Sequence, residues 1–246
     1  MSENEAGKLR AQVEGIRDKQ TADGINYLGV NTHYLFPTFY DLVQKKTVLD
    51  EIEKFLGPDI LCWNAAFFNK EPFDRKFVTW HQDLTYWGLD PPDIISAWIA
   101  LTPSIPENGC MRVVPGSHVK GQIDHVDSLA KNNILSRGQE IKVEVDEREA
   151  VDLVLQPGEM SLHHVLIIHG SRANSSNISR YGFVVRYIPT LCHQIGGRTE
   201  AMLVRGDDTY GHFYPVPRPQ SDLHADVLAF WEQANEKLNR ILFAGA

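Results

Sequence analysis

Residues 77–87 read Phe-Val-Thr-Trp-His-Gln-Asp-Leu-Thr-Tyr-Trp, a stretch rich in β-branched and aromatic side chains. This composition predicts a β-strand. Because alternate residues of a strand project from the same face, we expect His81 and Asp83 to point at one atom. An imidazole and a carboxylate placed in this way supply two ligands of a 2-His-1-carboxylate triad, a donor set that binds Fe(II) and leaves open positions on the metal.

The best candidate for the third ligand is His169, which follows the apolar run 165–168 and precedes Gly170. This pattern is typical of a strand that ends at a functional rim. His81 and His169 are too far apart in the sequence for a local loop to join them. We therefore expect tertiary structure to bring them together, as on the facing sheets of a β-barrel or jelly roll.

Three other histidines compete for the ligand role. His163 would share a face with His169 on an ideal strand, but a rise of ~3.3 Å per residue would place them about 20 Å apart, too far to chelate one ion. His164 has the opposite parity, which favours a core or supporting position. His118 follows a Pro-Gly-Ser turn, which favours a capping or surface role.

Arg180 lies eleven residues beyond His169 and opens a strand-like run that extends to Pro189. A guanidinium group makes two parallel charge-assisted hydrogen bonds to a carboxylate, so it suits the far carboxylate of a dicarboxylate cosubstrate. Ser171 offers a further hydroxyl donor. Arg186 shares the parity of Arg180 and stays open as an alternative anion-binding residue, although a salt bridge is favoured for it.

The order His-X-Asp, His and then Arg resembles the phytanoyl-CoA dioxygenase family of Fe(II)/2-oxoglutarate oxygenases. The resemblance extends from about Leu56 to the segment 205–213, and further matching blocks follow in order at residues 57–70, 98–101, 108–118 and 157–159. It implies a mainly β fold, a double-stranded β-helix (jelly roll, cupin-like) with flanking α-helices. Short β-like runs that alternate with turn signals from Ile60 onward independently favour a barrel.

The resemblance also implies roles for individual residues. It implies that the iron ligands are His81, Asp83 and His169. The residues that it implies for 2-oxoglutarate are Arg180, Ser171 and Trp98, with Gln82 and Ala66 as neighbours.

Three further residues are candidates for substrate contact. Tyr86 and Trp87 come just after the predicted ligands and are placed to line a substrate pocket, although ordinary barrel packing is an equally good interpretation. His212 belongs to a Tyr-Gly-His-Phe-Tyr segment that we expect near the mouth of the barrel.

In function, the resemblance implies a non-haem iron enzyme that uses Fe(II), 2-oxoglutarate and O2. Such an enzyme hydroxylates an unactivated C–H bond of a small-molecule metabolite and releases succinate and CO2. Asp83 occupies the position that related halogenases open for chloride, so hydroxylation is favoured over halogenation, and desaturation or cyclisation stays open. Two other classes are a cupin-like metal-dependent isomerase or hydrolase that does not use 2-oxoglutarate, and a binding module without catalysis.

Composition narrows the class of protein. The 246 residues fit one domain, 1–246, with enough apolar content for a core. A formal net charge of −8 argues against nucleic acid or an anionic membrane as partner. The sequence shows no signal segment and no apolar run that approaches a membrane span, so we expect a cytoplasmic protein, either a monomer or a homodimer. Its three cysteines are widely spaced, which disfavours disulfides and a thiolate zinc site.

Outside the predicted barrel, apolar spacing and a Gly-Pro stop signal predict a helix at 38–56, and residues 222–243 predict a terminal amphipathic helix. A charged helix with few apolar positions is expected at 3–19. Residues 122–150 are polar and lack strong periodicity, which predicts an insertion or lid over the barrel mouth. Residues 1–26 depart from the pattern of the resembling family, so their role stays open.

Overall fold

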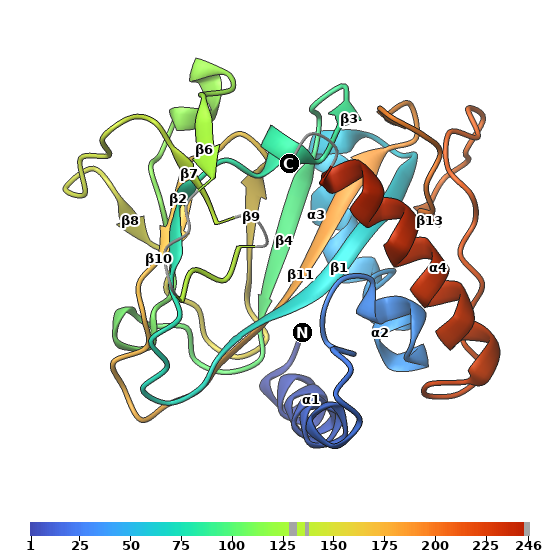
Figure 1. Cartoon of the computed structure of the whole chain (residues 1–246), viewed down its shortest axis with the longest axis horizontal. Helices are drawn as coiled ribbons and strands as arrows, with labels where there is room; N and C mark the ends of the chain where they lie inside the picture. The colour runs from blue at the N-terminus through green and yellow to red at the C-terminus, as the bar shows by residue number, and fades with distance from the viewer. Residues whose placement is uncertain (128–131, 136–137, 244–246) are drawn as a thin grey trace. The chain divides into compact units, whose positions relative to one another are not determined.

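The computed structural model describes residues 1–127, 132–135 and 138–243. The described chain is mainly β, with α-helices beside the strands (Figure 1). The α-helices are α1 (Glu3–Asp23), α2 (Pro37–Leu42), α3 (Lys46–Leu56) and α4 (Ala225–Leu242). The strands are β1 (Ile60–Lys70), β2 (Val78–His81), β3 (Leu89–Asp90), β4 (Ile95–Ala100), β5 (Met111–Val113), β6 (His125–Asp127), β7 (Gln139–Ile141), β8 (Val151–Asp152), β9 (Met160–His164), β10 (His169–Ser171), β11 (Arg180–Pro189), β12 (His193–Gln194) and β13 (Met202–Arg205). Short 3-10 helices are η1 (Thr32–Tyr34), η2 (Asp83–Tyr86), η3 (Pro106–Asn108) and η4 (Ser117–Lys120).

The longest strands form a sheet in the order β13-β1-β11-β4-β9. Its central strand, β11, is buried along its whole length and is rich in aromatic and β-branched residues, which suit a strand covered on both faces. The strand predicted from Arg180 to Pro189 is confirmed. A second sheet has the order β2-β10-β5-β8, and its neighbouring strands are antiparallel.

The chain divides into two compact units, each assembled from several segments. The first consists of Met1–Arg10, Phe68–Thr85 and Trp98–Gly182, and the second of Ala11–Phe67, Tyr86–Ala97 and Phe183–Ala246. The first unit contains the sheet β2-β10-β5-β8, and the second contains α2, α3, α4 and β13. The single domain 1–246 stays a prediction.

In the first unit, β10 lies between β2 and β5, and β2 and β10 lie side by side in Figure 1. A Cβ atom added at Gly170 would lie 3.0 Å from the Val78 carbonyl oxygen, which explains why the smallest residue occupies the middle of β10. The register pairs His169 with His81. The fold of this unit therefore places two of the predicted ligands opposite each other.

The region 122–150 contains the antiparallel pair β6 and β7. Next to these strands, Phe77 N donates to Asn132 O at 3.0 Å and Phe77 O accepts from Ile134 N at 3.1 Å, so this region is bonded to the residue just before β2. Residues 128–131 and 136–137 lie outside the described residues. The lid role of the region stays a prediction.

The second unit has an aromatic core. Phe67 lies 4.9 Å from Phe39 and 4.8 Å from Phe183, measured between ring centroids. The prediction of one helix over 38–56 is wrong, because Lys45 has an extended backbone and separates α2 from α3. Each of the two helices buries its own apolar face, which one straight helix would not achieve; Leu42 is buried on α2 and Ile52 on α3.

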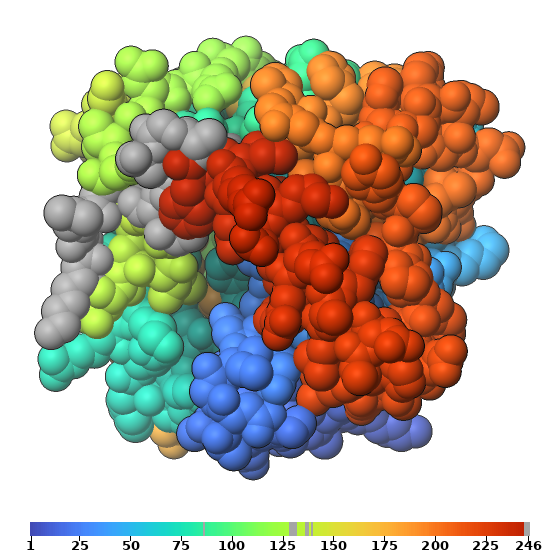
Figure 2. Space-filling view, turned by 45° about the vertical axis from the view of Figure 1, so that its right-hand side comes forward, coloured from blue at the N-terminus to red at the C-terminus, as the bar shows by residue number. Residues whose placement is uncertain are grey.

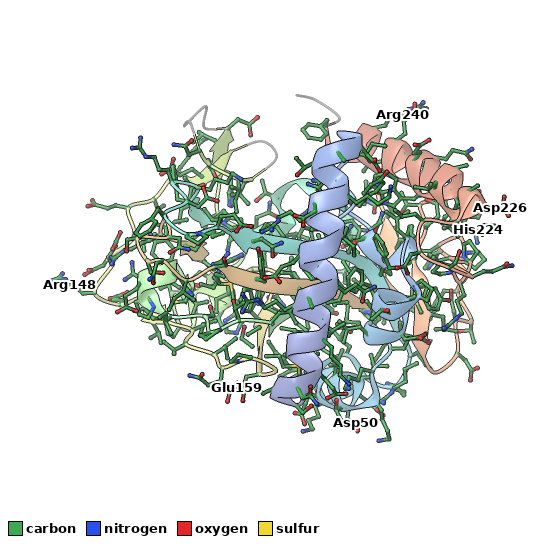
Figure 3. The ribbon with its side chains drawn as sticks, turned by 90° about the horizontal axis from the view of Figure 1, so that it is seen from below. Asp50, Arg148, Glu159, His224, Asp226 and Arg240 are labelled. Atoms are coloured by element: carbon green, nitrogen blue, oxygen red, sulfur yellow. The ribbon has the colours of Figure 1, made fainter. Side chains whose placement is uncertain are left out.

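The terminal helix predicted at 222–243 is confirmed as α4, which lies at the surface (red in Figure 2). Its buried residues follow helical spacing; they are Val227, Trp231, Ala234 and Leu238. Figure 3 shows His224 and Asp226 at one end of α4 and Arg240 near the other. The N-terminal helix is also confirmed, as α1. No helix among the described residues combines the length and apolar character needed to cross a membrane.

Candidate active site

The three predicted metal ligands converge within the first unit. Ligand atoms of His81, Asp83 and His169 all lie within 4.8 Å of one another, and all three residues are buried. His81 Nε2 lies 3.3 Å from Asp83 Oδ1, and His169 Nε2 lies 4.0 Å from the same oxygen. This spacing allows one metal ion to contact all three side chains.

The elements that carry these ligands differ from the sequence prediction. His81 is the last residue of β2, whereas Asp83 is the first residue of η2, so the two do not share one strand face as predicted. The chain turns at this point, and Asp83 N donates to Val165 O at 3.0 Å. The prediction that His169 ends a strand is also wrong, because this residue begins β10.

His163 lies close to the site, contrary to the separation expected for an ideal strand. β9 ends at His164, and the chain then turns, with Ile167 N donating to His164 O at 3.0 Å. This turn reverses the direction of the chain and brings His169 back beside His163, so the centroids of their rings are 5.2 Å apart. His163 is a buried third imidazole beside the two candidate histidine ligands.

Backbone carbonyl groups set the tautomer of both candidate ligand imidazoles. His81 Nδ1 lies 2.9 Å from Thr79 O, and His169 Nδ1 lies 3.0 Å from Ile167 O. A carbonyl oxygen only accepts, so each Nδ1 carries the proton and each Nε2 keeps a lone pair for a metal. Burial, followed by the neighbouring His81, lowers the pKa of His169 to about 3, which keeps this ring neutral as metal ligation requires.

Gln82 is fully buried between the two ligands of the tripeptide. Its Nε2 donates to Gly121 O at 2.9 Å and to Leu166 O at 2.7 Å, and its Oε1 accepts from Ile123 N at 2.7 Å. Both amide hydrogens and the amide oxygen of Gln82 are therefore used, and they join its own segment to residues 121–123 and to Leu166. The contact between Gln82 and 2-oxoglutarate stays a prediction, and these hydrogen bonds count against it.

Arg180 is buried at the start of β11. Its guanidinium group donates to Gly109 O and lies 5.5 Å from the centroid of the Trp98 ring. That ring rests on Gly182, where an added Cβ would lie 2.0 Å from Trp98 Cζ2. Burial lowers the pKa of Arg180 to about 10, so the group is still charged at neutral pH. Among the described residues its Nε has no hydrogen-bond partner and no carboxylate pairs with it.

Lys70 is a second buried basic side chain, and the sequence analysis missed it. It ends β1, where a lysine after an apolar strand normally indicates an exposed strand end. Its Nζ donates to Ser171 Oγ at 2.7 Å and also to Arg172 O. Burial, followed by the charge of Arg180, lowers the pKa of Lys70 to about 6.

Gly109 lies against both cations. Its carbonyl oxygen accepts from Arg180, and a Cβ added to it would lie 3.1 Å from Lys70 Nζ and 2.2 Å from Arg172 O. Its φ of 73° also favours glycine. Lys70 and Arg180 therefore both lie against Gly109, and Lys70 also bonds Ser171. The proposed carboxylate-binding group thus contains Lys70 in addition to the predicted Ser171 and Arg180.

The other predicted contacts belong to the second unit. Ala66 is buried in β1, and the Trp87 ring lies 5.0 Å from the guanidinium carbon of Arg186. The His212 ring stacks on Tyr210 at 5.6 Å between centroids. The side chain of Tyr86 lies outside the described part of the chain. The roles of Ala66, Tyr86, Trp87 and His212 in ligand binding stay predictions.

Comparison with known proteins places this geometry in context. The family model "Phytanoyl-CoA dioxygenase (PhyH)" matches residues 3–182. A probable alpha-ketoglutarate-dependent hypophosphite dioxygenase from Stutzerimonas stutzeri is 31% identical over 187 residues, which cover 73% of this chain and 64% of that protein. The chain thus spans slightly less than two thirds of the length of this curated relative.

Solved structures show the same fold. The non-heme monooxygenase ThoJ, in its apo form, is 31% identical with a TM-score of 0.89 over 98% of this chain and 91% of that chain. A nickel complex of ThoJ has a TM-score of 0.82. The carbocyclase SnoK, from nogalamycin biosynthesis, is 22% identical with a TM-score of 0.62 over 91% of this chain and 87% of that chain. The fold is the cupin-like double-stranded β-helix with flanking helices that the sequence predicted.

Proposed function

The chain belongs to the phytanoyl-CoA dioxygenase family, and from this premise we propose that it is a hydroxylase acting on an unactivated C–H bond of a small-molecule metabolite. Fe(II) and 2-oxoglutarate are the cofactor and the cosubstrate in this family, and O2 is the oxidant. The co-products of the proposed reaction are succinate and CO2.

The observation that carries the proposal is a pair of buried basic side chains, Lys70 and Arg180, in the same unit as the candidate ligands. Lys70 and Arg180 are close enough for their charges to interact, and neither forms an ion pair among the described residues; the charge of Asp74 favours protonated Lys70 but is outweighed by burial and by Arg180. Buried charges in folded proteins are normally paired, because leaving water is costly. A bound dicarboxylate would supply the missing negative charge.

Strand β10 connects the two halves of the proposed site. It carries the ligand His169 at its first residue and Ser171, the partner of Lys70, at its third. A rise of ~3.3 Å per residue separates these positions by about 7 Å. A five-carbon diacid extends over a comparable distance, with one end at the metal ligands and its far carboxylate at Lys70, Ser171 and Arg180.

His81, Asp83 and His169 would hold the iron, and their buried Nε2 and carboxylate atoms fit a facial triad. Bound Fe(II) supplies the oxidative chemistry. The chain orients both imidazoles through the carbonyl groups of Thr79 and Ile167, which leave each Nε2 free for the metal. Asp83 retains the carboxylate that a halogenase lacks, which favours hydroxylation over halogenation.

Desaturation or cyclisation is the second candidate, because a carbocyclase shares the fold. These reactions need the same iron ligands and the same cosubstrate, so product analysis separates them from hydroxylation. A metal-dependent isomerase or hydrolase needs no dicarboxylate, and the two buried cations count against it. The expected partner is a small-molecule substrate, and oligomeric state stays open between monomer and homodimer.

The test is a screen of small metabolites for substrate-stimulated release of succinate, with Fe(II), 2-oxoglutarate and O2 present. We expect one succinate for each product molecule and a product that has gained one oxygen atom. A product that has lost two hydrogens would instead identify a desaturase or cyclase. Turnover that is independent of both 2-oxoglutarate and O2 would overturn the proposal.

A further inference from the structure

A closed ring of hydrogen bonds surrounds Gln82, the residue between the histidine and carboxylate ligands of the tripeptide. Gln82 N donates to His125 Nε2 at 2.9 Å. His125 Nδ1 lies 2.7 Å from Ile123 O and 2.9 Å from Thr85 Oγ1. The Thr85 hydroxyl donates to Gln82 O at 3.5 Å. The side chains of His125 and Thr85 thus connect the backbone N–H of Gln82 to its own backbone carbonyl oxygen.

The direction of these bonds defines the state of the His125 ring. Because Nε2 accepts from a backbone N–H, the proton of the neutral ring is on Nδ1, which shares it between Ile123 O and Thr85 Oγ1. Burial is the largest cause that lowers the pKa of His125, in keeping with a neutral ring. A protonated ring would present a second donor to Gln82 N–H and break the hydrogen bond.

We propose that His125 is a positioning residue of the metal centre, which fixes the turn carrying His81 and Asp83 through its bond to Gln82. The inference rests on the proposed function, since it takes those two residues as metal ligands. Rotation of the peptide group at Gln82 would redirect both flanking side chains. Residues that orient metal ligands typically change metal affinity about 10- to 100-fold when they are removed.

The same ring ties β6 to the metal site. His125 is the first residue of β6, and Gln82 also bonds Gly121 O and Ile123 N just before it. The backbone from Gly121 to His125 is therefore joined to the ligand turn at three points. This part of the predicted lid region belongs to the support of the metal centre, and a displacement of β6 would be transmitted to the ligands.

The test titrates the metal-free protein with Co²⁺ alone, under anaerobic conditions, and records affinity and the visible absorption spectrum. His125→Leu is expected to weaken Co²⁺ binding about 10- to 100-fold and to change the spectrum, because the ligand turn is no longer fixed. His125→Gln places an amide oxygen near the position of Nε2 and is expected to recover most of the affinity. Thr85→Val, which opens the ring at its longer bond, is expected to have a smaller effect.

His224→Asn is the matched control, since it removes a partly exposed imidazole from α4 and keeps an acceptor at the helix N-cap. Its Co²⁺ affinity is expected to equal that of the natural sequence. The Tm of each metal-free variant measures any loss of folding stability, separately from the change in Co²⁺ affinity. If His125→Leu lowers the Tm of the metal-free protein but leaves Co²⁺ affinity and spectrum unchanged, the inference is overturned.

The proposed function fails in a different way. In that case the protein with its natural sequence does not bind Co²⁺, or Asp83→Ala binds it equally well. If Asp83→Ala abolishes binding while His125→Leu has no effect, the ligand assignment stands and only the positioning role of His125 is rejected.

Discussion

His81 and His169 are paired across neighbouring antiparallel strands, with their ring centroids 4.1 Å apart. The pair exists only when β2 and β10 are in register, because a shift of one residue would turn one imidazole to the opposite face. Asp83 joins them from the 3-10 helix that follows β2. Correct pairing of β2 and β10 is thus a condition for the candidate metal site.

Asp83→Ala is expected to weaken Fe(II) binding by about 100-fold or more, since loss of a ligand costs at least as much as loss of a residue that orients one. Anaerobic titration with Fe(II) measures the affinity, and succinate release measures the loss of turnover. Asp93→Ala removes an exposed carboxylate and serves as control. Unchanged iron-dependent turnover in Asp83→Ala would reject the ligand assignment.

Arg180→Ala is expected to raise the concentration of 2-oxoglutarate needed for half-maximal binding by about 100-fold or more, because a buried charge pair would lose one partner. Calorimetry with the metal-loaded protein checks this affinity. The matched control is Arg148→Ala, because Arg148 is 91% exposed and points outward in Figure 3. A mild effect of Arg180→Ala would move the anchor elsewhere, with Arg186 as the first alternative.

Binding of 2-oxoglutarate is expected to take up a proton near pH 7.5. The pKa of Lys70 is lowered to about 6 by burial and by Arg180, so its amine is mostly neutral at this pH before binding. A bound carboxylate raises that pKa, so affinity falls as pH rises above about 6, by up to about tenfold per unit. Calorimetry in two buffers with different ionisation enthalpies measures the uptake.

Lys70→Met supplies the control for this pH dependence, because methionine has a similar length and no titrating group. The variant is expected to bind 2-oxoglutarate more weakly and without proton uptake. Equal proton uptake by Lys70→Met and the natural sequence would show that another group titrates.

Gly109→Ala is expected to destabilise the protein by more than Gly116→Ala. Both glycines have positive φ, 73° and 75°, so both substitutions strain the backbone by about 1–2 kcal/mol. At Gly109 the new Cβ would also lie 2.2 Å from Arg172 O, whereas at Gly116 it meets nothing within 4 Å. Chemical denaturation gives both free energies of unfolding, and equal values would contradict the close contact at Gly109.

The sequence predicted the convergence of His81, Asp83 and His169, because a metal site of this kind requires particular residue types in a particular order. It also predicted β11 from Arg180 to Pro189, since a run of aromatic and β-branched residues has few alternatives to a strand. The local path of the chain was harder to predict. The apolar residues 165–168 suggest a strand, but they form the turn that brings His163 back beside His169.

Lys70 and His125 were missed for different physical reasons. The burial of Lys70 depends on Ser171 and Arg172, which lie far along the chain, so nothing near Lys70 in the sequence marks it. His125 bonds a backbone N–H, a group that every residue except proline possesses. A sequence pattern reveals side-chain chemistry, and it does not reveal which main-chain group a side chain will meet.

The short distance along β10 between His169 and Ser171 has a consequence for which keto acids the protein can bind. Only Gly170 separates His169 from Ser171. The distance between these two positions is set by the backbone, so substitution of other side chains does not change it. If the diacid binds as proposed, a homologue one methylene shorter would not reach both ends, and a longer one would have to bend. On this proposal, changing the preferred diacid would require insertion or deletion of backbone, so other substitutions could alter the substrate pocket while the cosubstrate stays the same.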